Sequence, residues 1–142
     1  MIGGTALGST GSEWPADIEK FSRITQDIAQ KHNSFNLLFA SIGLFRSEKE
    51  VLFAAPKECK PLTELHLDVF RSIMDEKVAL WNYYYPERWI PHCAITARNS
   101  YSEVCKAVQA IEKMVIPFNA IAEKLVLVNF VDGIEICSHN LG

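Results

Sequence analysis

Hydrophobic residues recur with a helical period in three stretches of this chain, and they alternate or run together between these stretches. The helical positions expected to face a core are Ile18, Phe21, Thr25 and Ile28, then Leu62, Leu65, Val69 and Ile73, then Val104, Val108, Ile111 and Val115. The first helix should begin near Ser12–Pro15 and end near residue 33. The second should span about 61–77, and the third should be capped by Ser100 or Ser102 and end before Pro117.

Extended segments are predicted between the helices. They cover residues 35–43, 50–56, 90–99, 118–122, 124–130 and 134–138, with a weak edge strand over 2–8. The polar residues 46–50 form the turn of one hairpin, and Asp132-Gly133 forms the turn of another. Helix–strand–strand therefore occurs twice, over about 15–55 and 100–138. This order predicts an α+β fold with antiparallel sheets and helices packed on the outside.

Composition limits the class of protein. With 142 residues, 49% of them hydrophobic, the chain is predicted to form a single domain over 1–142. The net charge of −3 provides no broad basic surface for nucleic acid, although one nucleotide or a short RNA end can still bind in a pocket. No run is long enough for a membrane span. The four cysteines are widely spaced, which favours reduced thiols and a cytoplasmic location.

The stretch Tyr85–Ala97 holds the candidate chemistry. Pro86 and Pro91 exclude a helix there, and the residues that follow are predicted to form a strand. On a regular strand His92, Ala94 and Thr96 share one face. An imidazole that moves protons beside a hydroxyl that holds an oxygen suits phosphate chemistry.

The residues from Tyr84 to Thr96 read Tyr-Tyr-Pro-Glu-Arg-Trp-Ile-Pro-His-Cys-Ala-Ile-Thr. They resemble the second signature of the two-histidine (2H) phosphoesterases, the superfamily of 2′-5′ RNA ligase-like proteins, in which Tyr-x-Pro-x-x-Trp-x-Pro leads into His-x-Thr/Ser. Ala94 stands where the family has the hydroxyl residue. The resemblance implies two similar lobes, each offering a motif strand to a cleft. It also implies two histidines that act as base and acid on a phosphodiester, without metal or other cofactor.

The first signature of the family precedes the first helix, and the corresponding residues here are Gly4-Thr-Ala-Leu-Gly8. Gly4 replaces the histidine and Ala6 the hydroxyl residue. We therefore expect a 2H-phosphoesterase-like domain that lacks the family's first strand and one half of the catalytic pair. A start upstream of Met1 is the alternative. A missing strand leaves an unpaired sheet edge, which allows a homodimer.

The resemblance implies that His92 is the acid or base. Thr96, on the same predicted strand face, is the candidate to hold a phosphate oxygen in place of the missing hydroxyl residue, and Tyr85 and Trp89 are candidates to line the substrate site by stacking on a base. The implied ligands are 2′,3′-cyclic or 2′-5′ phosphodiesters of RNA ends or small nucleotides. A catalytically inactive descendant that binds a nucleotide or a protein is the alternative. The aromatic residues can also be plain core and cleft wall.

Three other histidines have structural interpretations or none. His66 is interpreted as structural, His32 as a partner of a helix dipole, and His139 has no assigned role. Cys137 and His139 share a strand face, whereas His92 and Cys93 do not, so no metal site is predicted.

Overall fold

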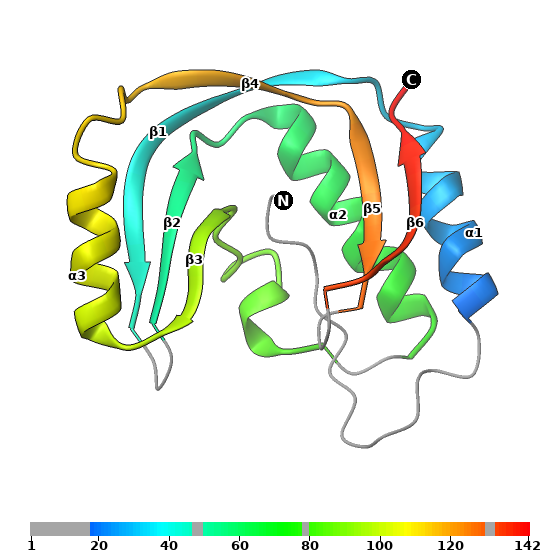
Figure 1. Ribbon diagram of the computed structural model, residues 1–142. Helices are drawn as coiled ribbons and strands as arrows, with labels where there is room; N and C mark the ends of the chain where they lie inside the picture. Colours follow the sequence, from blue (N-terminus) through cyan, green and yellow to red (C-terminus); the bar gives the residue numbers. More distant parts are fainter. Residues whose placement is uncertain (1–17, 47–49, 78–79, 130–132) are drawn as a thin grey trace. The chain divides into compact units, whose positions relative to one another are not determined.

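The α+β class is confirmed by a computed structural model that describes residues 18–46, 50–77, 80–129 and 133–142 (Figure 1). Its elements are α1 (Ile18–Ala29), β1 (Phe35–Phe45), β2 (Glu50–Pro56), α2 (Lys60–Asp75), the 3₁₀ helix η1 (Asn82–Tyr84), β3 (Cys93–Asn99), α3 (Tyr101–Ala110), β4 (Phe118–Ala122), β5 (Lys124–Val128) and β6 (Glu135–Asn140). The strand predicted over 2–8 and the helix start predicted at Ser12–Pro15 lie outside the described residues.

The chain divides into two compact units, as the two-lobed architecture predicts. The first unit contains Leu37–Glu58 and Ile90–Ala120, and the second contains 18–36, Cys59–Trp89 and Ile121–Gly142. Within these ranges no helix has the length and apolarity needed to cross a membrane.

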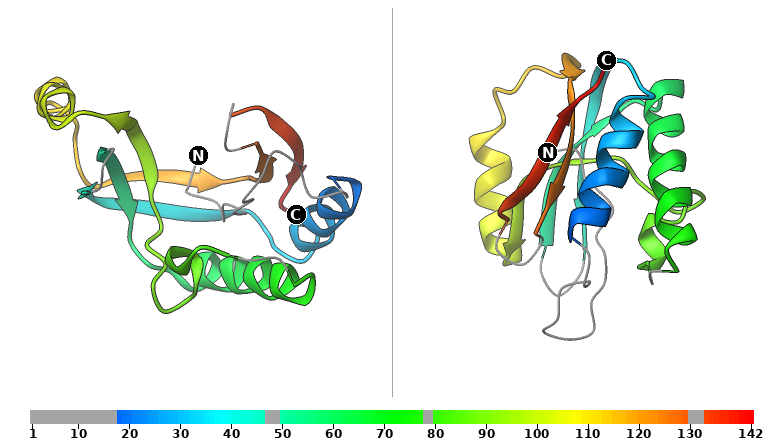
Figure 2. Two further views of the ribbon diagram at one scale, coloured as in Figure 1. Left: turned by 90° about the horizontal axis from the view of Figure 1, so that it is seen from below. Right: turned by 90° about the vertical axis from the view of Figure 1, so that its right-hand side faces the viewer.

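The first unit is built on a four-stranded sheet in the order β3-β2-β1-β4 (Figures 1 and 2). The predicted hairpin of β1 and β2 is present and antiparallel, and β3 pairs antiparallel with the other side of β2. Phe39 of β1 stacks on Phe118 of β4 with ring centroids 4.9 Å apart. Leu37 and Leu52 are almost fully buried. These large apolar side chains form the core on which β3 is held.

The second unit contains the β5–β6 pair and the helices α1 and α2. α1 packs against both strands and against α2. The predicted periodicity of α2 is confirmed for Leu62, Leu65 and Ile73, which are buried, and His66 is buried beside them. The β5–β6 hairpin is antiparallel as predicted, and Gly133 has the positive φ of 73° that its turn requires. Asp132, the other predicted turn residue, lies outside the described residues.

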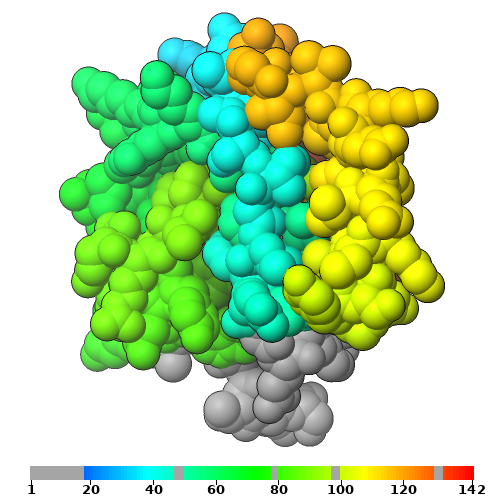
Figure 3. Space-filling view, turned by 90° about the vertical axis from the view of Figure 1, so that its left-hand side faces the viewer, coloured from blue at the N-terminus to red at the C-terminus, as the bar shows by residue number. Residues whose placement is uncertain are grey.

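Helix α3 differs from its prediction at its C-terminal end. It packs against β2 and β3, and Val104 is its one buried residue. Val108 lies within the helix but on its exposed side, and Val115 lies beyond the end of the helix at Ala110. They are exposed by 47% and 79%, so the prediction that they face the core is wrong. The surface position of α3 is visible in the space-filling view (Figure 3).

Ser100, one of the two predicted caps, begins α3 with a capping box. The Glu103 N–H donates to Oγ of Ser100 over 3.4 Å, and the Ser100 N–H donates to Oε2 of Glu103 over 2.7 Å. The backbone N–H and the hydroxyl of Ser100 both donate to Oε2 of Glu103, and these two hydrogen bonds lower the pKa of that carboxyl.

Ser100→Ala should reduce the free energy of unfolding by about 1 kcal/mol, because it leaves a helix N–H without its partner. Urea denaturation measures the change. Ser102→Ala, at the second residue of the helix, is the matched control. Equal effects of the two substitutions would contradict the assignment of Ser100 as the cap.

Candidate functional site

His92 lies directly before β3, where the chain leaves two prolines and enters the strand. The strand was predicted from Ile90 but begins at Cys93, because Pro91 has no N–H to donate to a sheet. Nδ1 of His92 lies 2.8 Å from the carbonyl oxygen of Ile90. A carbonyl can only accept, so Nδ1 carries the proton of this bond. In the neutral ring Nε2 is then the basic nitrogen.

Two phenylalanines hold the His92 ring against the first unit. The centroid of the His92 ring lies 5.0 Å from that of Phe45 and 5.5 Å from that of Phe53, both in edge-on geometry. The two phenylalanine rings stack on each other at 4.1 Å. Gly43 is paired with Phe53 across β1 and β2, and its missing side chain leaves room for the Phe53 ring. The imidazole is therefore supported by packing as well as by its hydrogen bond.

Thr96 does not share the face of His92, so that expectation is wrong. Across β2 and β3, Phe53 is paired with Ala94 and Leu52 is paired with Thr96, with a register shift between them. Neighbouring residues of β2 point to opposite faces, so Ala94 lies on the Phe53 face with His92, and Thr96 lies on the other. The Thr96 hydroxyl is buried, and it has no hydrogen-bond partner among the described residues.

Tyr85 lies in the second unit, at the start of a turn in which its backbone carbonyl accepts two hydrogen bonds. The backbone N–H groups of Arg88 and Trp89 donate to the Tyr85 oxygen over 2.8 and 2.9 Å. The Tyr85 ring meets Phe70 of α2 edge-on at 5.3 Å. Its remaining surface lines an open pocket with Asn82, Glu87 and Arg88. The predicted role of Tyr85 in ligand binding stays a prediction.

Trp89 stacks on His66 of α2. The ring centroids lie 3.7 Å apart and the planes differ by 5°. Nε1 of Trp89 and Nε2 of His66 are both buried and have no hydrogen-bond partner among the described residues. One face of Trp89 is thus covered by the protein. Its predicted role at the substrate also stays a prediction.

His66 is a neutral histidine at physiological pH. Burial lowers its pKa from 6.5 to about 4, although a hydrogen bond to the Tyr84 backbone favours the charged form. The interpretation of His66 as structural overlooked this stack, because nothing in the spacing of His66 and Trp89 along the chain indicates it.

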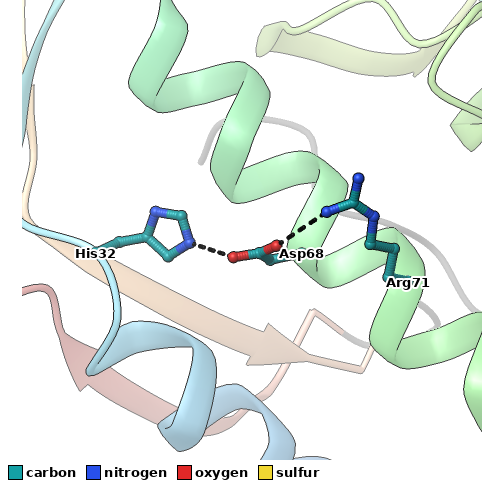
Figure 4. A network of polar contacts seen from close by, with 3 residues as sticks. All are labelled: His32, Asp68 and Arg71. Carbon is teal, nitrogen blue, oxygen red and sulfur yellow. Dashed lines mark hydrogen bonds and ion pairs between the residues drawn. The ribbon is translucent and has the colours of Figure 1, made fainter.

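His32 belongs to a polar network in the second unit (Figure 4). Its Nε2 lies 2.9 Å from Oδ2 of Asp68, whose Oδ1 lies 3.7 Å from Nη1 of Arg71. The sequence suggested a helix dipole as the partner of His32 and gave no signal for Asp68. Asp68 is on α2, so this pair joins α2 to the segment that follows α1.

His139 and Cys137 lie on β6, opposite Leu125 and Leu127 of β5. Nε2 of His139 is buried and has no partner among the described residues. Across the described part of the chain, no three His, Cys, Asp or Glu side chains are arranged to hold a metal ion.

The candidate first motif, with Gly4 and Ala6, lies outside the described residues. The described site therefore consists of His92, its hydrogen bond to Ile90, and the rings of Phe45 and Phe53 that pack against the imidazole.

Gly43→Ala should destabilise the protein by about 1–3 kcal/mol, because the added Cβ would lie within 2.6 Å of Cε2 of the buried Phe53 ring. The displaced ring should also change the environment of His92. Thermal unfolding and the NMR signals of the His92 ring measure the two effects. Ser41→Ala, at an exposed position of β1, is the control, and an equal effect there would contradict the steric argument.

Comparison with protein families identifies a superfamily that this chain matches. The sequence model described as the 2′-5′ RNA ligase superfamily matches residues 10–133, a range that includes the whole of Tyr85–Ala97. A comparison with curated proteins found no match.

Proposed function

Because the chain belongs to the 2′-5′ RNA ligase superfamily, we propose that it binds and cleaves 2′,3′-cyclic or 2′-5′ phosphodiesters of RNA ends or small nucleotides. His92 is the acid/base residue of this proposal. The observation that carries it is the bond from Nδ1 to the Ile90 oxygen, which leaves Nε2 as the reactive nitrogen.

The chemistry needs only proton transfers at Nε2. In hydrolysis of a cyclic phosphodiester, a water oxygen bonds to phosphorus and the bond to one ribose oxygen breaks. Neutral Nε2 takes a proton from the attacking water, and the ring then returns a proton to the departing ribose oxygen. Phe45 and Phe53, which pack against the imidazole, keep it in one orientation through both proton transfers.

Binding without turnover is the second candidate, favoured by the register of β3. The motif position for the hydroxyl is Ala94, and Thr96 lies on the opposite face from His92. Loss of one oxygen donor costs about 10²–10³ in rate, and loss of one acid or base costs about 10²–10⁴. With Gly4 and Ala6 in the first motif, turnover is expected to be slow.

The test uses the full chain with a panel of 2′,3′-cyclic nucleotides, a 2′-5′-linked dinucleotide and a 3′-5′-linked dinucleotide as control, with EDTA present. Slow cleavage of the first two classes alone supports the catalytic proposal. Heat of binding in calorimetry without any product supports the binding candidate. If neither product nor heat is found, both are rejected.

The cytoplasmic location and the homodimer also stay predictions. In the described residues β3 and β4 form the edges of the four-stranded sheet, where a second copy can pair.

A further inference from the structure

The sheet face that carries His92 in the first unit also carries the hydroxyl of Ser41, on β1. Alternate residues of a strand point to the same face, so Ser41, Gly43 and Phe45 share one face of β1. The His92 ring packs against Phe45, which identifies this face as the one on which the imidazole lies. The described strands β1, β2 and β3 hold two hydroxyl side chains, and the other one, that of Thr96, lies on the opposite face.

The strand register brings Ser41 into line with His92 across β2. Ser41 is paired with Ala55 of β2. Cys93, the first residue of β3, is paired with Ala54. Continued by one residue, this antiparallel pairing places His92 beside Ala55. Because neighbouring strands lie about 4.8 Å apart, the Cα atoms of Ser41 and His92 are separated by about 10 Å.

Small side chains occupy the surface between the imidazole and the Ser41 hydroxyl. Ala55 lies between them on β2, and Ala94 is the next residue of β3 on this face. The imidazole reaches over β2, since its ring centroid lies 5.0 Å from that of Phe45 on β1. Ser41 and Ala94 are exposed and Ala55 is half-buried, so a ligand can lie on this surface between His92 and Ser41.

Cleavage of a phosphodiester needs a hydrogen-bond donor as well as an acid or base. Charge develops on the non-bridging phosphate oxygens in the transition state, and a hydroxyl can donate to one of them. Ala94 cannot supply this donor from the motif position, and Thr96 faces away. Hydrogen bonds of about 2.8 Å on each side of a phosphate fit a backbone separation of about 10 Å. Ser41 can therefore hold an oxygen while Nε2 of His92 transfers protons.

We propose that Ser41 is a substrate-binding residue, whose hydroxyl donates to a non-bridging phosphate oxygen and replaces the hydroxyl that is absent at Ala94. This role rests on the proposed function, because it concerns the same phosphodiester ligand. The donor comes from β1 and not from the strand that follows His92. The three residues all belong to the first unit.

The first test measures kcat and KM of the full chain with a 2′,3′-cyclic nucleotide. Ser41→Ala should lower kcat by about 10²–10³-fold, the usual cost of one lost donor to a developing charge. Ser41→Thr keeps a hydroxyl and should restore most of the rate. Ser102→Ala, which removes an exposed hydroxyl from α3, is the matched control and should have the wild-type kcat. A folded Ser41→Ala protein with the wild-type kcat overturns the proposal.

Sulfur in place of one non-bridging oxygen gives a readout that a structural role of Ser41 would not change. The two phosphorothioate diastereomers of the cyclic nucleotide carry sulfur on opposite sides of the phosphate. The wild type should cleave one of them faster, because only that one presents an oxygen to the Ser41 hydroxyl. Ser41→Ala should reduce this preference, whereas Ser102→Ala should leave it unchanged. An equal loss of rate for both diastereomers in Ser41→Ala overturns the proposal.

A binding measurement separates this proposal from the proposed function. If the wild type binds the cyclic nucleotide without turnover, Ser41→Ala should raise Kd in calorimetry by about 10–100-fold, the usual effect of losing a hydrogen bond to a charged group. An unchanged Kd overturns the role of Ser41 and leaves the binding function standing. A wild type that neither binds nor cleaves the nucleotide overturns the proposed function and the role of Ser41 together.

Discussion

Replacement of His92 by alanine should lower turnover of a 2′,3′-cyclic phosphodiester by about 10²–10⁴-fold, the usual contribution of one general acid or base. The reason is chemical and local. The Nδ1–H bond to Ile90 leaves Nε2 as the only ring nitrogen able to take and return a proton. The substitution removes the side chain that carries the proton. It leaves Phe45 and Phe53, which support the His92 ring from β1 and β2, in place.

The measurement is kcat and KM of the purified variant beside those of His92→Gln and His32→Gln. Glutamine at position 92 keeps a polar side chain that cannot act as a base, so it should be as inactive as alanine. His32→Gln removes an imidazole from the second unit, where it pairs with Asp68, and should retain activity if it folds. Wild-type rates in both His92 variants would show that the activity has another origin.

Acidification should destabilise the protein through His66. The folded pKa of this ring is about 4, below its ordinary value of 6.5. Above pH 6.5 neither state binds the proton, so His66 makes no difference to stability. Between pH 6.5 and 4 the unfolded chain binds the proton and the folded one does not. The free energy of unfolding should then fall by about 1.4 kcal/mol per pH unit, or about 3 kcal/mol in all.

Urea denaturation at several pH values between 7 and 4 measures this loss. Carboxylates also titrate in the lower part of that range, so the useful quantity is the difference between the wild type and His66→Phe. The variant has no proton to bind at this position and should lose about 3 kcal/mol less on acidification. Parallel curves for the two proteins would show that His66 titrates normally in the folded state.

The sequence predicted the elements that depend on local pattern. The periodicity of Leu62, Leu65 and Ile73 identified α2, and the run from Glu50 to Pro56 gave β2 to the residue. The predicted third helix failed beyond Ala110, because the apolar spacing that continues to Val115 there belongs to exposed residues. Spacing alone does not distinguish a buried stripe from an exposed one.

The site was predicted less completely, because its decisive features come from tertiary contacts. His92 was identified by its flanking Trp89 and Pro91. The register shift that separates Ala94 from Thr96 depends on how β3 pairs with β2, and regular alternation cannot reveal it. The contacts of His66 with Trp89 and of His32 with Asp68 join residues far apart in the chain, so no local pattern indicates them.

The bulge in β3 limits the evolutionary routes by which this strand can regain a complete motif. The threonine already present at position 96 cannot take over the role of the lost hydroxyl, because the extra residue turns it to the other side of the sheet. Position 94 faces the same side as His92 and its side chain is exposed, so it has room for a larger residue. A single Ala94→Thr change in a descendant lineage would restore the pattern, whereas no change at position 96 can.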